Sequence, residues 1–153
     1  MKWNTVEVER QGEIAVVSLA RPESLNAFNE ELIEELTEVG RSFHRDHAVN
    51  AVILTGRGKA FCAGFDLKQP PPPRDFAERR DVMHGGRHLC RAWEEMPQTT
   101  IAAIEGPAVG AGVAIAISCD WRVMADDAYL YVPEVKIGLT LQWQAIPRLV
   151  ALV

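Results

Sequence analysis

Residues 100–120 combine residue types that could bind a negatively charged oxygen. Residues 100–104 are apolar and predict a buried strand, which a tight connection follows. Residues 111–119 are apolar on every side, which predicts an interior helix. The first N–H groups of a helix have no intrahelical partner and lie at the positive end of its dipole. We expect Gly110 and Gly112 to keep the approach open, so that these N–H groups could stabilise negative charge on a ligand oxygen.

A second candidate loop, residues 60–67, has the sequence AFCAGFDL and follows another apolar strand. That strand, residues 51–55, is short and uniformly apolar, which is typical of a parallel strand covered on both faces. The small side chains and the glycine of the loop would let its backbone approach a ligand closely. We therefore expect chemistry at the loops that follow these two strands.

The elements around these loops alternate between strands and helices. Residues 5–9 and 14–19 predict an antiparallel hairpin, and Asn29 is predicted to cap the helix that follows. Further along, two short strands are predicted at residues 121–125 and 128–131, and a last helix begins at Pro147. The alternation predicts an α/β domain.

The segment between the two candidate loops is less regular. Four consecutive prolines at residues 70–73 predict a stiff extended spacer, because proline cannot continue a helix. Residues 75–95 predict a helix, and Gly85 and Gly86 in its middle should weaken it. We expect mobility there.

Composition excludes several classes of protein. The chain has 153 residues, is 48% hydrophobic and 24% charged, and is long enough to bury a core. A net charge of −5 and the lack of a basic cluster argue against nucleic-acid binding. Three widely spaced cysteines without a CxxC pattern indicate neither a disulfide framework nor a zinc site, and favour the cytoplasm. No apolar run approaches the roughly 20 residues that a membrane helix needs.

The sequence argues against three other kinds of site. Ile115 stands where a dinucleotide fingerprint would have its third glycine. His84 and His88 have the spacing of helical metal ligands but lack a third ligand, so they are interpreted as surface residues and no metal is expected. Cys62 lacks an identifiable base, which favours a small buried residue over a nucleophile.

Three motifs occur in order: RPESLNAF at residues 21–28, AFCAGFDL at residues 60–67 and IAAIEGPAVGAG at residues 101–112. Together they resemble the crotonase superfamily, the enoyl-CoA hydratase/isomerase family. The resemblance implies a ββα spiral of the ClpP/crotonase type over residues 1–153, with two roughly perpendicular sheets. It also implies a trimer or hexamer in the full-length protein, built with C-terminal helices that this chain is expected to lack.

The resemblance further implies that two backbone N–H groups form an oxyanion hole for the thioester of an acyl-CoA, which is the substrate, so that no separate cofactor is needed. Residue-by-residue matching assigns these groups to Phe65 and Ala111. Coenzyme A contacts are expected from six further residues: Ser24, Leu25, Ala27, Ala63, Asp66 and Gly110. For Asn26 a role in the site and a role in fixing the turn before the helix both remain open.

The carboxylates distinguish between reactions of this family. Hydratases that the chain resembles use two glutamates around a water molecule; the second matches Glu134, whereas the first position is Ala114. One glutamate suffices to move a double bond, so isomerisation is preferred slightly over the hydration of fatty-acid oxidation. A non-catalytic acyl-CoA binding or assembly protein is the third possibility. Trp143, in a segment where relatives are glycine-rich, could close the pocket or simply pack, and packing is preferred.

Overall fold

The computed structural model describes residues 2–68 and 74–153. Its elements follow in chain order: β1 (Val6–Gln11), β2 (Ile14–Leu19), η1 (Pro22–Ser24), α1 (Glu30–Phe43), β3 (Ala51–Gly56), α2 (Phe76–Glu94), β4 (Thr99–Ile104), β5 (Ala108–Val109), α3 (Ala111–Ala116), β6 (Trp121–Met124), β7 (Leu130–Tyr131), η2 (Glu134–Ile137) and α4 (Ala145–Leu152). The proline run at residues 70–73 lies outside the described residues, so the predicted spacer stays a prediction.

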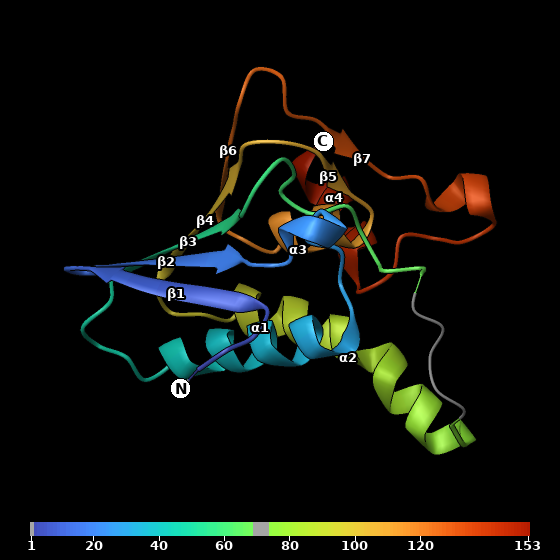
Figure 1. Ribbon diagram of the computed structural model, residues 1–153, viewed down its shortest axis with the longest axis horizontal. Helices are drawn as coiled ribbons and strands as arrows, with labels where there is room; N and C mark the ends of the chain where they lie inside the picture. The colour runs from blue at the N-terminus through green and yellow to red at the C-terminus, as the bar shows by residue number, and fades with distance from the viewer. Residues whose placement is uncertain (1, 69–73) are drawn as a thin grey trace.

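A five-stranded sheet in the order β1-β2-β3-β4-β6 forms the centre of the fold (Figure 1). β1 and β2 pair antiparallel from Val6↔Leu19 to Gln11↔Ile14, which confirms the predicted hairpin. Gly12 occupies its turn with a φ of +64°, a value that glycine adopts without strain. β2, β3, β4 and β6 run parallel, so the chain must cross over between them, and α1 and α2 are two of these crossovers.

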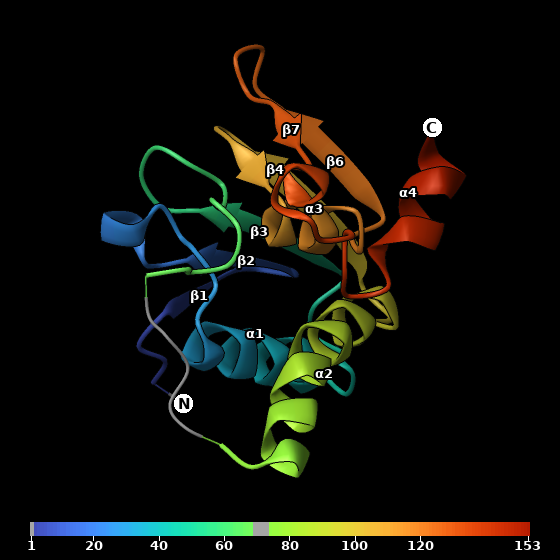
Figure 2. The same cartoon turned by 90° about the vertical axis from the view of Figure 1, so that its right-hand side faces the viewer.

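α1 and α2 lie side by side beneath the main sheet (Figures 1 and 2). Asn29 caps α1 as predicted, because its side chain accepts a hydrogen bond of 2.9 Å from the Leu32 N–H. The two helices cover one face of the sheet, and along β3 Val52 and Leu54 are buried whereas Ile53 is partly exposed. The prediction of a strand covered on both faces is therefore confirmed for one face, whereas the other face is only partly covered.

α2 runs unbroken through Gly85 and Gly86, so the predicted weak point in this helix is not observed. Each glycine allows a close contact. A Cβ on Gly85 would lie 3.2 Å from Cγ2 of Ile33, and one on Gly86 would overlap the indole of Trp143 at 1.9 Å. A capping box between Asp75 and Glu78 stabilises the start of the helix.

A second, small sheet consists of β5 and β7, which pair in parallel. Both predicted strands near residues 121–131 form, but they belong to different sheets, because β6 extends the main sheet and β7 joins the small one. α3 is buried as predicted and ends at Ala116, earlier than expected. α4 begins at Ala145, two residues before Pro147.

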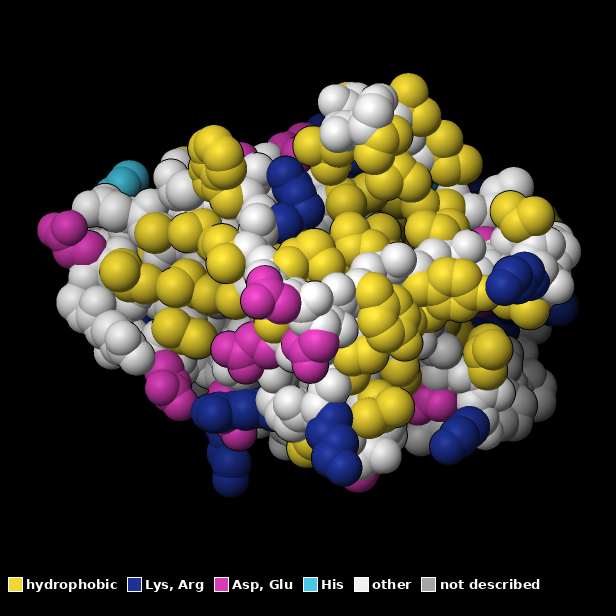
Figure 3. All heavy atoms as spheres, turned by 90° about the horizontal axis from the view of Figure 1, so that it is seen from above, with side chains coloured by type: hydrophobic (Ala, Val, Ile, Leu, Met, Phe, Trp, Pro, Cys, Tyr) yellow, Lys and Arg dark blue, Asp and Glu magenta, His cyan; other side chains and the backbone are white. Residues whose placement is uncertain are grey.

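Apolar side chains also gather on the upper surface of the molecule (Figure 3). The exposed ones in the second half of the chain belong mainly to β6, β7, η2 and α4 and include Trp121, Val123, Val135, Ile137 and Val150. No helix in the described ranges is long and apolar enough to span a membrane.

Candidate active site

Backbone hydrogen bonds bring the two predicted loops together. The Cys62 N–H donates to the Pro107 carbonyl at 3.1 Å, and the Val109 N–H donates to the Cys62 carbonyl at 2.9 Å. The Gly110 N–H in turn donates to the Tyr131 carbonyl at 2.8 Å. Three segments distant in sequence therefore meet at the start of α3, and they carry Phe65, Ala111 and Glu134 respectively.

The backbone N–H groups of Phe65 and Ala111 are available to a ligand. Phe65 forms a parallel bridge with Phe28. The hydrogen bonds of this bridge come from its neighbours, because the Phe28 N–H donates to the Gly64 carbonyl and the Asp66 N–H donates to the Phe28 carbonyl. Within residues 2–68 and 74–153, neither the Phe65 N–H nor the Ala111 N–H has a hydrogen-bond partner. Since both residues line the same cavity, their free N–H groups can serve as donors there.

Glu134 supplies a carboxylate beside these donors. It is the first residue of η2, and a Cβ on Gly110 would lie only 2.6 Å from its Oε1 atom. Gly110 has a φ of +50°, so both the backbone conformation and the carboxylate require glycine at this position. The Oε2 atom of Glu134 is buried and has no hydrogen-bond partner among the described residues. An unpaired buried carboxylate oxygen is costly in a structural role and is a common feature of functional sites.

Gly112 has a different function from the one predicted. A Cβ at this position would lie 2.6 Å from the Cys62 carbonyl oxygen and 2.8 Å from the Cys62 Cβ. The glycine therefore lets the two loops pack together, and the prediction that it keeps a ligand approach open was wrong. Cys62 is fully buried, and burial raises the pKa of its thiol to about 12, which agrees with the prediction of a structural residue.

A cavity of about 640 Å³ lies at this junction, within the range of small-molecule sites. Six of the nine predicted site residues line it, namely Ala63, Phe65, Asp66, Gly110, Ala111 and Glu134. Ser24, Leu25 and Ala27 are not among the residues that line it. Leu25 nevertheless lies next to the lining, because its carbonyl accepts a hydrogen bond from the Ala63 N–H at 2.9 Å. Contacts of coenzyme A with these residues stay a prediction.

Asn26 is a structural residue. It is fully buried, its side-chain oxygen accepts from the Arg21 N–H at 3.0 Å, and its Nδ2 donates to the carbonyls of Arg57 and Ala60, each at 2.8 Å. With these bonds it joins the RPESLNAF segment to the loop after β3. Of the two roles considered for Asn26, the structure supports the one in holding the backbone.

Asp66 faces the cavity and also anchors the Phe65 loop. Its Oδ2 is 3.1 Å from Nη2 of Arg21, and both side chains are more than nine-tenths buried. Arg21 also donates to the Ala27 carbonyl, and the Lys68 N–H donates to Oδ1 of Asp66 at 3.1 Å. This buried ion pair holds the Phe65 backbone beside the start of α3.

Replacing Asp66 by alanine should destabilise the fold by about 3–5 kcal/mol, because the buried charge of Arg21 would lose its partner. Urea unfolding of the two proteins measures the difference. The control is Glu38→Ala, which removes an exposed ion pair with Arg41 and should cost less than about 1 kcal/mol. Equal effects of the two substitutions would contradict the anchoring role of Asp66.

The carboxylate expected of a hydratase is missing from the cavity. Ala114 lies one turn after Ala111 on the same face of α3, and its methyl group is buried against the cavity. Trp143 also lines the cavity and packs edge-on against Phe28, with ring centroids 5.2 Å apart. The preferred role of Trp143 in packing is therefore confirmed, and its ring also forms part of the cavity lining.

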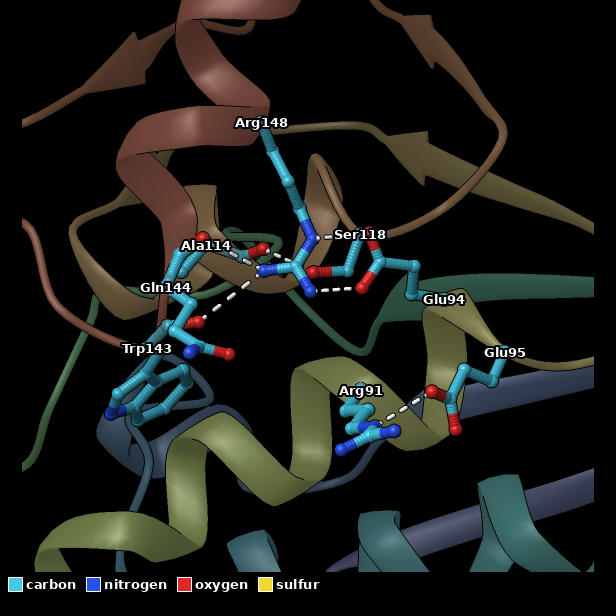
Figure 4. A network of polar contacts seen from close by, with 8 residues as sticks. All are labelled: Arg91, Glu94, Glu95, Ala114, Ser118, Trp143, Gln144 and Arg148. Carbon is cyan, nitrogen blue, oxygen red and sulfur yellow. Dashed lines mark hydrogen bonds and ion pairs between the residues drawn. The ribbon is translucent and has the colours of Figure 1, made fainter.

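Arg148 of α4 supports the turn that carries Trp143 (Figure 4). Trp143 and Gln144 have φ values of +60° and +57°, and the left-handed conformation costs a residue with a side chain roughly 1–2 kcal/mol. The Arg148 Nη1 donates to both of their carbonyls, at 3.4 and 2.9 Å. Its other nitrogens bind both carboxylate oxygens of Glu94 on α2, and this hydrogen bonding holds the pKa of Glu94 below its usual range.

The contact of Trp143 with Gly86 and the pairing of Arg148 with Glu94 were not predicted from the sequence. Two adjacent glycines inside a predicted helix are a signal for close packing, although they do not reveal the partner. The rings of His84 and His88 lie 6.2 Å apart, and the described part of the chain contains no group of three or more residues suited to hold a metal ion.

Comparison with known proteins identifies the family. Residues 9–153 match the model of the family described as enoyl-CoA hydratase/isomerase. The chain is 41% identical over 140 residues to a protein of Mycobacterium bovis named "Probable enoyl-CoA hydratase echA6", and 37% identical over 154 residues to the short-chain-enoyl-CoA hydratase of Clostridium acetobutylicum. The chain belongs to the enoyl-CoA hydratase/isomerase family, the crotonase superfamily that its three motifs resemble.

Solved structures support the same conclusion. The fold matches an enoyl-CoA hydratase/carnithine racemase from Magnetospirillum magneticum with a TM-score of 0.88 and 31% identity, over 97% of this chain and 56% of that one. This is a crotonase fold, as the sequence predicted. The match to the mycobacterial relative includes 92% of this chain but only 55% of that relative. The match to the clostridial relative includes 59% of that protein, so the chain spans little more than half the length of either relative.

Proposed function

We propose that this chain acts on acyl-CoA thioesters and moves a double bond within an enoyl-CoA, with Glu134 as the acid/base residue. The observation that carries the proposal is the position of the Glu134 carboxylate. Among the described residues, one of its oxygens is buried without a hydrogen-bond partner and the other lies against Gly110. Ala111, whose N–H also lacks a partner in this part of the chain, comes next in the sequence.

The N–H groups of Phe65 and Ala111 stabilise the thioester oxygen in this proposal. Removal of a proton from C2 shifts negative charge onto that oxygen, and two fixed donors lower the energy of the resulting enolate. Loss of one such donor costs roughly 3–4 kcal/mol in comparable sites. The shared cavity and the free donors support this role.

Glu134 completes the reaction by carrying one proton. Its carboxylate takes a proton from C2 of a 3-enoyl-CoA, and the electron pair spreads over the dienolate that forms. The same carboxyl group then returns the proton to C4, so that the double bond ends between C2 and C3 with no net change in protons or electrons. No second carboxylate is required, which suits an alanine at position 114.

Hydration of a 2-enoyl-CoA is the second candidate, because the matched relatives of Mycobacterium and Clostridium carry hydratase names. Hydration needs a bound water to be oriented and deprotonated while C2 is protonated, a task that two carboxylates share more easily than one. Ala114 offers no polar group for this purpose, which is why we rank hydration second.

The test supplies the full-length chain with a 3-enoyl-CoA in heavy water and identifies the products by mass spectrometry. We expect 2-enoyl-CoA with deuterium at C4 or C2, formed faster than any 3-hydroxyacyl-CoA. Faster formation of 3-hydroxyacyl-CoA from 2-enoyl-CoA would favour hydration. Binding of the thioester without exchange or turnover would favour a non-catalytic acyl-CoA binding protein.

Coenzyme A thioesters as ligands receive support from structural neighbours. A putative enoyl-CoA hydratase of Thermobifida fusca, 29% identical with a TM-score of 0.86, has been described in complex with acetoacetyl-CoA and with CoA.

No cofactor beyond the substrate is proposed. Assembly into a trimer or hexamer and a cytoplasmic location stay predictions, and the exposed apolar side chains of β6 and η2 support the former.

A further inference from the structure

The indole of Trp143 occupies space that only a glycine on α2 leaves free. A Cβ on Gly86 would lie 1.9 Å from Cε2, 2.0 Å from Nε1 and 2.3 Å from Cδ2 of this ring. Gly86 is buried in the interior of a helix, where glycine is less favourable than alanine. The close contact with the Trp143 ring explains why glycine, and not alanine, occupies position 86 of this helix.

Two further contacts hold the ring in place. Phe28 packs against it at an interplanar angle of 76°, and Arg148 binds the carbonyls of Trp143 and Gln144 while it is itself bound to Glu94. In Figure 4 the indole points away from Arg148 and toward α2. The ring is therefore a fixed wall of the cavity, with little room to rotate.

Trp143 lies at a part of the cavity lining where apolar side chains gather. Ile33, Met83 and Leu141 line the cavity together with Trp143 and Gly86. The charged part includes Arg79 and the Arg74–Glu30 ion pair. Arg79 and Gly86 both belong to α2 and are seven positions apart, which corresponds to about 10 Å along the helix axis. A ligand with a polar and an apolar end would place its hydrocarbon against Trp143.

We infer that Trp143, seated on Gly86, limits the length of the acyl chain that the cavity accepts, and that the substrates are short-chain acyl-CoA thioesters. This inference rests on the proposed function and adds the residue that selects among its substrates. In this inference the acyl chain extends toward the rigid indole, which stops further methylene groups, so that lengthening the chain brings no gain in binding.

Titration calorimetry of the full-length chain with butyryl-CoA, decanoyl-CoA and free CoA tests the inference. The unaltered protein should bind butyryl-CoA at least as tightly as decanoyl-CoA. Trp143→Ala should shift the ratio of the two affinities toward decanoyl-CoA by about tenfold or more, because each newly buried methylene strengthens binding roughly fourfold. Trp143→Phe should give an intermediate shift, and the control Phe76→Ala, at an exposed aromatic position outside the cavity lining, should give none.

Thermal unfolding tests the seating of the ring independently of any ligand. Gly86→Ala should lower the melting temperature of the unaltered protein, since its Cβ collides with the indole, yet raise that of Trp143→Ala, where the normal preference of helices for alanine returns. The matched control Gly85→Ala meets only Cγ2 of Ile33, at 3.2 Å, and does not approach the indole, so it should change the melting temperature of both backgrounds alike.

The possible results separate this inference from the proposed function. Tighter binding of decanoyl-CoA by the unaltered protein, or an unchanged affinity ratio in Trp143→Ala, would overturn the role of Trp143 and leave acyl-CoA binding intact. Absence of binding with all three ligands would overturn the proposed function and this inference with it. If Gly86→Ala changed the melting temperature in the same direction in both backgrounds, the packing of the Trp143 ring on Gly86 would be refuted.

Discussion

Glu134→Gln should lower the rate of C2-proton exchange of an enoyl-CoA by roughly 10²–10⁴-fold, the usual contribution of a general acid/base group. Glutamine has nearly the same shape and still fits beside Gly110, but it cannot accept and return the proton. Binding of the acyl-CoA should therefore change little. Exchange followed by NMR in heavy water, together with calorimetric binding, measures both quantities.

The matched control for this substitution is Glu105→Gln. Glu105 is exposed, lies in the connection after β4 and is not part of the cavity lining, so the same chemical change there should leave exchange within about twofold of the unaltered rate. An undiminished rate of proton exchange in Glu134→Gln would contradict the role of Glu134 as the acid/base residue. A parallel loss in the control would show that the effect is not specific to Glu134.

Ala111→Pro should reduce turnover by roughly 10²–10³-fold, the effect of losing one oxyanion donor. Ala111 is the first residue of α3, a position where proline fits helix geometry, and the preceding Gly110 has no Cβ to collide with the ring. The substitution removes the free N–H, so kcat should fall while the helix persists. Steady-state kinetics and circular dichroism measure the two outcomes.

Phe76→Pro is the control for placing proline at the start of a helix. Phe76 is the first residue of α2, is 80% exposed and follows Asp75, whose extended backbone suits a residue before proline. It should leave turnover unchanged. If a folded Ala111→Pro protein kept its turnover within about twofold, the Ala111 N–H could not be a donor to the reacting oxygen.

The prediction of the fold succeeded where local rules decide structure. The hairpin of β1 and β2, the cap at Asn29 and the strand β4 follow from alternation, capping chemistry and apolar runs, which neighbouring residues determine. Predictions failed where the outcome depends on a contact with a distant residue. The two glycines of α2 were interpreted as a weakness because a sequence does not show that Ile33 and Trp143 pack against them.

The sequence by itself determined the family, the two loops that carry Phe65 and Ala111, and the replacement of a carboxylate by Ala114, because residue types at ordered spacings suffice for these conclusions. Only the tertiary structure decided that Gly110 makes room for Glu134 and that Asp66 is paired with Arg21. Each of these pairs joins segments more than twenty residues apart. Such contacts form only when the sheet and its crossovers bring the segments together, so no local pattern encodes them.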